Sequence, residues 1–166
     1  SYSLENLESK LKTYLRRYNP QLLETLGNFP EDYNRKILSE LQTRLRKFSD
    51  FEELTNFFYE EKESFDTSIF INHKMKIADL KDVRDNLEFA YNILKDESYD
   101  ISDIESIKNI FISKISEAEK KNGQVLWPVR VALSGEIFSP WALELIYIFG
   151  REKSMQKLQK SLKLLS

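Results

Sequence analysis

Apolar residues recur every three or four positions along almost the whole chain. The first helix-like stretch carries them at Leu4, Leu7, Leu11, Tyr14, Leu15 and Tyr18. One apolar stripe at this spacing is typical of an amphipathic helix that packs on a core. Asn19-Pro20 then predicts the end of the helix, because a residue that precedes proline avoids the α conformation.

The same periodicity predicts seven further helices, over about residues 21–26, 30–47, 49–58, 79–94, 102–123, 140–149 and 152–165. Ser49 with Glu52, and Ser102 with Glu105, have the spacing of capping boxes. Residues 61–78 are mixed and polar, and no segment alternates as a strand does. We therefore expect an all-α fold, a helical cage of two packed subdomains at residues 1–70 and 71–166.

A different pattern separates the last helices. Gly123 predicts a helix end, and Trp127-Pro128 predicts an extended backbone before a short apolar run that contains Arg130. Ser139-Pro140 has the residue types of an N-cap and a first-turn proline, and Gly150 predicts the end of that helix. We expect a loop with arginine, serine and backbone amides at its tip, held between two capped helices and suited to binding nucleotides.

Fixed identities at fixed spacing fill this stretch: Gly123, Pro128, Arg130, Ala132, Leu133, Ser134, Gly135, Ser139, Pro140, Glu144, Gly150, Arg151 and Glu152. The pattern resembles the signature of the C-terminal anticodon-binding region of bacterial-type glutamyl-tRNA synthetases, which are class I enzymes. That region is all-helical and has two helical parts. The resemblance implies a cytoplasmic, monomeric partner of the anticodon loop of the glutamate tRNA.

The resemblance also implies roles for single residues. Arg44, within Leu41–Asp50, matches an arginine that reads the third anticodon base, and Arg130, Ser139 and Pro140 match contacts to the first two bases. Trp127 would either stack on a splayed base or fill the core beneath the loop. Trp141 stands where glycine is common in the family, and its bulky ring would either cover apolar surface or change how the middle base stacks. Without the resemblance, Arg44 would be a surface arginine and Arg130 a salt-bridge partner that orients the loop.

The catalytic signatures of the family, His-Ile-Gly-His-like and Lys-Met-Ser-Lys-like, do not occur in the 166 residues; Lys74-Met75-Lys76 matches the second only superficially. We therefore expect a fragment without catalytic domain or cofactor, ATP and magnesium belonging to the parent ligase. The missing initiator methionine also suggests a processed or engineered fragment. Two alternatives remain open: a stand-alone helical protein-interaction module, and the same domain from a relaxed enzyme that charges both glutamate and glutamine tRNAs.

Charge and composition narrow the classes further. The net charge is −2, but after residue 119 eight lysines and arginines face three glutamates, which is compatible with a basic face on an acidic body. The chain has no cysteine, which excludes disulfides and thiolate zinc sites. His73 is the single histidine, so we expect neither a histidine-based metal site nor a Ser-His-Asp arrangement. No apolar run is long enough to span a bilayer.

Overall fold

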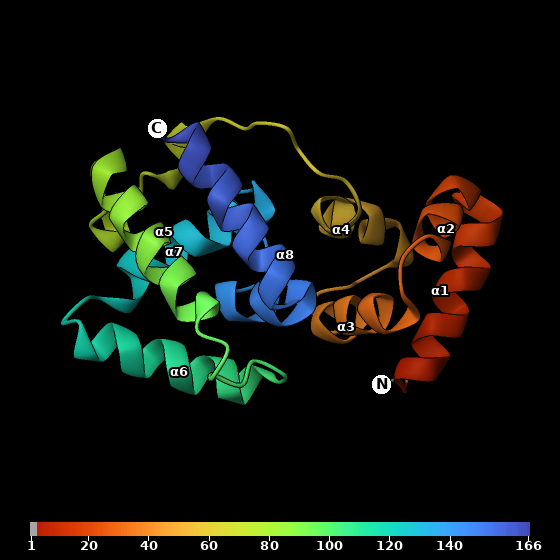
Figure 1. Ribbon diagram of the computed structural model, residues 1–166. Coiled ribbons are helices and arrows are strands. Elements are labelled where there is room, and N and C mark those ends of the chain that lie inside the picture. Colours follow the sequence, from red (N-terminus) through yellow and green to blue (C-terminus); the bar gives the residue numbers. More distant parts are fainter. Residues whose placement is uncertain (1–2) are drawn as a thin grey trace. The chain divides into compact units, whose positions relative to one another are not determined.

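Helices form nearly every regular element between residues 3 and 166, the part of the chain that the computed structural model describes (Figure 1). Within these residues there are eight α-helices and three short 3-10 turns, and β pairing is limited to one isolated bridge between Asn72 and Ile77. The all-α prediction is confirmed. The chain divides into two compact units, the first ending at Glu61 and the second beginning at Lys62.

The first unit contains α1 (Leu4–Tyr18), α2 (Pro20–Gly27), α3 (Glu31–Leu41), the 3-10 turn η1 (Phe48–Asp50) and α4 (Phe51–Tyr59). Two predicted helix boundaries at its start are explained by caps. The Ser3 side chain accepts a hydrogen bond from the Asn6 amide, and the Asn19 side chain accepts one from the Leu22 amide. Asn19 thus ends α1 and starts α2, with Pro20 at the first helical position.

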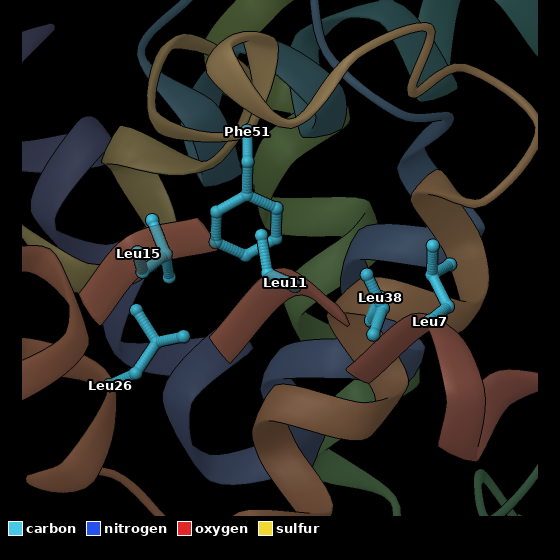
Figure 2. Packing of buried hydrophobic residues seen from close by; sticks show 6 residues of the cluster. All are labelled: Leu7, Leu11, Leu15, Leu26, Leu38 and Phe51. Atoms are coloured by element: carbon cyan, nitrogen blue, oxygen red, sulfur yellow. The ribbon is translucent and has the colours of Figure 1, made fainter. Parts of the chain in front are cut away.

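Figure 2 shows the core of this unit, which is formed by Leu7, Leu11, Leu15, Leu26, Leu38 and Phe51. The three α1 leucines lie on one face because they are four residues apart, as the sequence pattern predicts. Each fully buried side chain of this size contributes about 1.5–3 kcal/mol relative to an exposed one. The periodic leucines therefore decide how the first unit is assembled.

The second unit contains η2 (Thr67–Phe70), η3 (His73–Met75), α5 (Leu80–Lys95), α6 (Ile104–Glu117), α7 (Asn122–Ser134) and α8 (Ala142–Leu164). Helices α5, α7 and α8 pack against one another, and α6 packs on α7 and α8 (Figure 1). The polar stretch 62–78 takes part in this unit, because Phe70 and Ile77 are buried in it. Two polar-looking turns are thus anchored by single apolar side chains.

Both predicted capping boxes are wrong in detail. Helix α4 begins after Asp50, which makes no side-chain cap bond, while Glu52 accepts a hydrogen bond from Asn19 Nδ2 at 2.9 Å. Helix α6 is capped by Asp103, whose carboxylate accepts from the Ser106 amide at 2.8 Å. The same helix ends at Glu117 rather than Gly123, and Glu119 takes the left-handed conformation with φ 57°.

The largest departure from the prediction is α7, which is a continuous helix where we expected a loop. Pro128 lies inside it, although an interior proline costs about 3 kcal/mol in helix formation. Val125, Pro128, Val129 and Leu133 are all buried on the packed side of α7. Burial of this apolar set offsets the lost backbone hydrogen bond, so the run of hydrophobic residues outweighs the local proline signal.

Helix α8 departs from the prediction at one end and agrees with it in the middle. Ser139 is not its N-cap, because the helix begins at Ala142 with Trp141 in the cap position. Gly150 does interrupt it, with φ 82° and ψ 173° between two helical arms. The predicted break at Gly150 is confirmed.

Candidate nucleic-acid interface

The site suggested by the sequence is built around residues 135–141, which we call the α7–α8 loop. Gly135 closes α7 in the left-handed conformation, with φ 66°, and its amide donates to the Val131 carbonyl at 2.7 Å. The Ser134 hydroxyl donates to the Arg130 carbonyl at 2.8 Å and accepts from the Glu136 amide at 3.1 Å. These bonds fix the direction in which the chain leaves the helix.

Arg130 on α7 fixes the far end of the α7–α8 loop. Its Nε donates to Ser139 Oγ at 2.9 Å, and its Nη2 donates to the Ser139 carbonyl at 2.8 Å. The Ser139 hydroxyl in turn donates to the Pro140 carbonyl at 2.8 Å, and Pro140 is buried. The orienting role that the sequence allowed for Arg130 is thus filled by hydrogen bonds to the loop itself.

Two tryptophan rings lie close to the same guanidinium. Arg130 Cζ lies 5.6 Å from the Trp127 ring centroid and 5.5 Å from the Trp141 ring centroid, within the range of cation–π interaction. Trp127 is half-buried and its Nε1 donates to the Ile69 carbonyl at 3.3 Å. Trp141 is 63% exposed. The two rings therefore differ: Trp127 ties α7 to η2, and Trp141 presents a surface to solvent.

Sequence reasoning missed the tip of the loop. Phe138 is 86% exposed and Ile137 is 49% exposed, beside the exposed Trp141. Neighbouring exposed apolar side chains of this size mark interaction surfaces. The sequence feature that could have indicated this surface is the pair Ile137-Phe138, which fits no helical periodicity and directly precedes Ser139-Pro140.

A cation from the polar stretch also supports the loop. Lys62 Nζ donates to the Gly135 carbonyl at 3.1 Å and pairs with the Glu136 carboxylate. Lys160 on α8 donates to the Lys62 carbonyl and so holds that residue in turn. No sequence pattern indicates that these three segments are in contact.

Arg44 lies in the first unit. Helix α3 ends at Leu41, earlier than predicted, and Arg44 stands in the turn that follows, with its amide donating to the Leu41 carbonyl at 2.9 Å. The residue is half-buried. Arg44 therefore lies beyond the end of the helix instead of within its last turns, and it belongs to a different unit from the five other predicted site residues.

Arg151, another member of the sequence signature, has a structural role. Its guanidinium donates to the carbonyls of Leu94, Asp96 and Tyr99, so it caps the C-terminal end of α5 and the turn beyond it. In this turn, hydrogen bonds from the Ser98 hydroxyl and amide lower the pKa of Asp96 below its ordinary value. The Gly150-Arg151 pair thus joins α8 to α5.

Two properties of the part of the chain from residue 3 onward limit the chemistry. No three histidine, aspartate or glutamate side chains gather there in a way that could hold a metal ion. None of its helices combines the length and apolar character that crossing a membrane requires.

Comparison with known proteins gives one family. The anticodon binding domain model matches residues 6–162. The glutamate–tRNA ligase of Clostridium botulinum strain Eklund 17B is 34% identical over 137 residues, which cover 81% of this chain and 28% of that protein. The ligase of Clostridium kluyveri is 32% identical over 168 residues, covering 93% and 33%.

Solved structures agree on the fold. The glutamate tRNA ligase from Elizabethkingia meningosepticum superposes with a TM-score of 0.68 at 20% identity, over 99% of this chain and 33% of that one. The glutamate–tRNA synthetase of Elizabethkingia anophelis gives a TM-score of 0.66 at 19% identity, over 98% and 32%. This chain therefore spans about a third or less of the length of the ligases that it resembles.

Proposed function

The chain belongs to the anticodon-binding domain family, and from this membership we propose that it binds the anticodon loop of the glutamate tRNA as part of a glutamate–tRNA ligase. The observation that carries the proposal is the α7–α8 loop, where Arg130 lies within 5.6 Å of the Trp127 ring centroid and 5.5 Å of the Trp141 ring centroid and donates a hydrogen bond to Ser139. This arrangement holds exposed aromatic surface beside a positive charge. Unpaired RNA bases are recognised by such combinations of stacking and cationic groups.

Within this proposal, Trp141 and Phe138 provide stacking surfaces for the first two anticodon bases. Stacking of a base on an aromatic side chain contributes roughly 1–3 kcal/mol per base. Ser139 and Pro140 act from within the loop, because Ser139 is hydrogen-bonded to Arg130 and Pro140 is buried. Trp127 acts from helix α7, where its Nε1 donates to the Ile69 carbonyl in η2. Arg130 keeps the loop in shape and adds positive charge next to the bases.

Arg44 reads the third base in this proposal. Glutamate anticodons end in C and glutamine anticodons end in G. Cytosine offers a carbonyl and a ring nitrogen as acceptors on its Watson–Crick edge, whereas guanine presents donors beside its carbonyl. A guanidinium has only donors and stays protonated, so it matches cytosine and opposes guanine. A good bidentate contact of this kind gives on the order of 1–3 kcal/mol of discrimination, by analogy with base readout in duplexes.

The test is a pair of titrations at one salt concentration, with the glutamate anticodon hairpin and a counterpart whose anticodon ends in G. We expect the wild-type chain to prefer the first hairpin by about ten-fold or more, and Arg44→Gln to narrow that ratio. Lys81→Gln is the matched control, since Lys81 is 76% exposed on α5 and lies 3.9 Å from Asp85. It should shift both affinities equally, as loss of one exposed charge does.

Each other outcome has a defined meaning. An unchanged ratio in Arg44→Gln would show that Arg44 is not the reader of the third base. Equal wild-type affinity for both hairpins would contradict strict glutamate recognition and favour the relaxed enzyme. Failure to bind either hairpin would overturn the proposal and leave the protein-interaction module as the remaining reading of this helical fold.

A further inference from the structure

An aromatic cluster in the first unit joins two segments that are distant in sequence. The Tyr14 ring on α1 lies 4.9 Å from the Tyr18 ring and 5.6 Å from the Phe48 ring, centroid to centroid. Phe48 begins η1, four residues after Arg44. The last turns of α1 therefore lie beside Phe48, the residue that follows the segment 42–47.

Tyr18 gives this surface an unusual feature. Its side chain is 62% exposed, although it is large and apolar over most of its ring. Arg17 Cζ lies 5.2 Å from the Tyr18 ring centroid, so a guanidinium accompanies the exposed ring. An exposed ring with an adjoining arginine has the composition of a stacking site for nucleobases.

The surrounding charge is mainly positive. Arg16 and Arg17 lie in the last turn of α1, and the segment between α3 and η1, residues 42–47, carries Arg44, Arg46 and Lys47. Two carboxylates lie nearby: Asp50 is 3.9 Å from Lys47, and Glu52 accepts a hydrogen bond from Asn19. Favourable interaction with the helix dipole accounts for cations after a helix C-terminus, but it does not account for an exposed tyrosine among them.

We propose that Tyr18, Arg17, Arg46 and Lys47 form a second RNA-binding surface, the α1 patch, which continues from the turn of Arg44. The Tyr18 ring stacks on an unpaired base, and the cations contact the flanking phosphates. The occupant is RNA because its bases and phosphates match both features of the patch, the exposed ring and the excess of cations. This inference rests on the proposed function, since it assumes that the chain binds tRNA.

The experiment uses the full-length glutamate tRNA transcript and measures its dissociation constant for the chain at several salt concentrations. Tyr18→Leu should weaken binding by about ten-fold, and Tyr18→Phe, which keeps the ring, should restore it. The double variant Arg46→Gln, Lys47→Gln should reduce the slope of the logarithm of the binding constant against the logarithm of the salt concentration. The reduction should correspond to the loss of about one to two phosphate contacts. Lys81→Gln serves again as the control for loss of a single exposed lysine.

The outcomes separate the two proposals. If Tyr18→Leu and the double variant bind the tRNA with the wild-type dissociation constant, the α1 patch is refuted. The proposal for the α7–α8 loop would not be affected. Loss of affinity in both Tyr18→Leu and Tyr18→Phe, with an unaltered helical spectrum, would also contradict stacking, because the ring is present in one of them. Absence of wild-type binding would overturn the proposed function and the α1 patch together.

Discussion

Gly150 allows a sharp test of how the second unit is held together. Its φ of 82° and ψ of 173° lie in a region that is open essentially to glycine alone. An ideal Cβ built at this position has no heavy atom within 4 Å, apart from its chain neighbours and the backbone of its own helix within four residues. Gly150→Ala therefore introduces backbone strain without a steric clash, and any loss of stability reports on the backbone conformation itself.

The expected magnitude follows from two opposing contributions. A residue with a side chain costs about 1–3 kcal/mol in this region, whereas alanine restricts the unfolded chain and regains about 0.4–1 kcal/mol. These ranges leave a net cost of roughly 0–2.6 kcal/mol, and from their midpoints we expect Gly150→Ala to lower the free energy of unfolding of the second unit by about 1.3 kcal/mol. Urea unfolding followed by tryptophan fluorescence measures this directly, because the only two tryptophans, Trp127 and Trp141, both belong to the second unit.

Gly27→Ala is the matched control. Gly27 also has no heavy atom within 4 Å of an ideal Cβ, but it is the last residue of helix α2. Alanine there should leave the free energy of unfolding of the first unit unchanged or raise it by up to about 1 kcal/mol. Unfolding followed by circular dichroism would record this change. If the urea midpoint of Gly150→Ala is equal to or above that of the wild type, the reasoning is refuted. Such a result would mean that the break in α8 at residue 150 tolerates a side chain.

Three further outcomes follow from the contacts of the second unit. Arg151→Gln should destabilise this unit by about 2–4 kcal/mol in the same urea assay, because three carbonyls lose a charged donor, while Arg84→Gln on the exposed side of α5 should change it little. Arg130→Lys should weaken hairpin binding by up to about ten-fold with stability nearly unchanged, since lysine lacks the fork that reaches both Ser139 atoms; equal affinity would contradict the positioning role. The folded-state pKa of Asp96 is lowered, so the carboxylate stabilises the fold above its ordinary pKa of 3.8, and this stabilisation is lost as the pH falls below that value. Thermal unfolding should therefore show that Asp96→Asn loses less stability in acid than the wild type does.

The periodic part of the fold could be predicted from the sequence because its signals are local. Leucine spacing in α1 gave the buried face, and Asn19-Pro20 gave the boundary with α2. Helix α7 could not be predicted in this way. Pro128 and Gly123 are strong local signals against a helix, and only contact with α5 and α8 supplies the burial that overrides them.

In the candidate site, too, local features could be predicted from the sequence and features that depend on tertiary contacts could not. The family resemblance placed Arg130 and Ser139 in the same site. It did not indicate that the Arg130 guanidinium donates hydrogen bonds to Ser139. The exposure of Phe138 depends on how the loop is pinned, which no spacing in the sequence encodes. The contact between Tyr14 and Phe48 joins segments more than thirty residues apart, so the neighbourhood of Tyr18 was likewise outside the reach of sequence patterns.

The α7–α8 loop keeps apolar side chains in water because both of its ends are fixed. Lys62 binds the start of the loop through the Gly135 carbonyl, and Arg130 binds its end through Ser139. A loop held in this way cannot fold back to bury Phe138, and it loses little conformational freedom when a ligand covers it. Lys160 belongs to this support because it donates to the Lys62 carbonyl, although its position on the last helix suggests an ordinary solvated or phosphate-binding lysine. Loss of the Lys160 ammonium should therefore loosen the loop as well as remove a charge, which is why Lys81 is the better control for the charge alone.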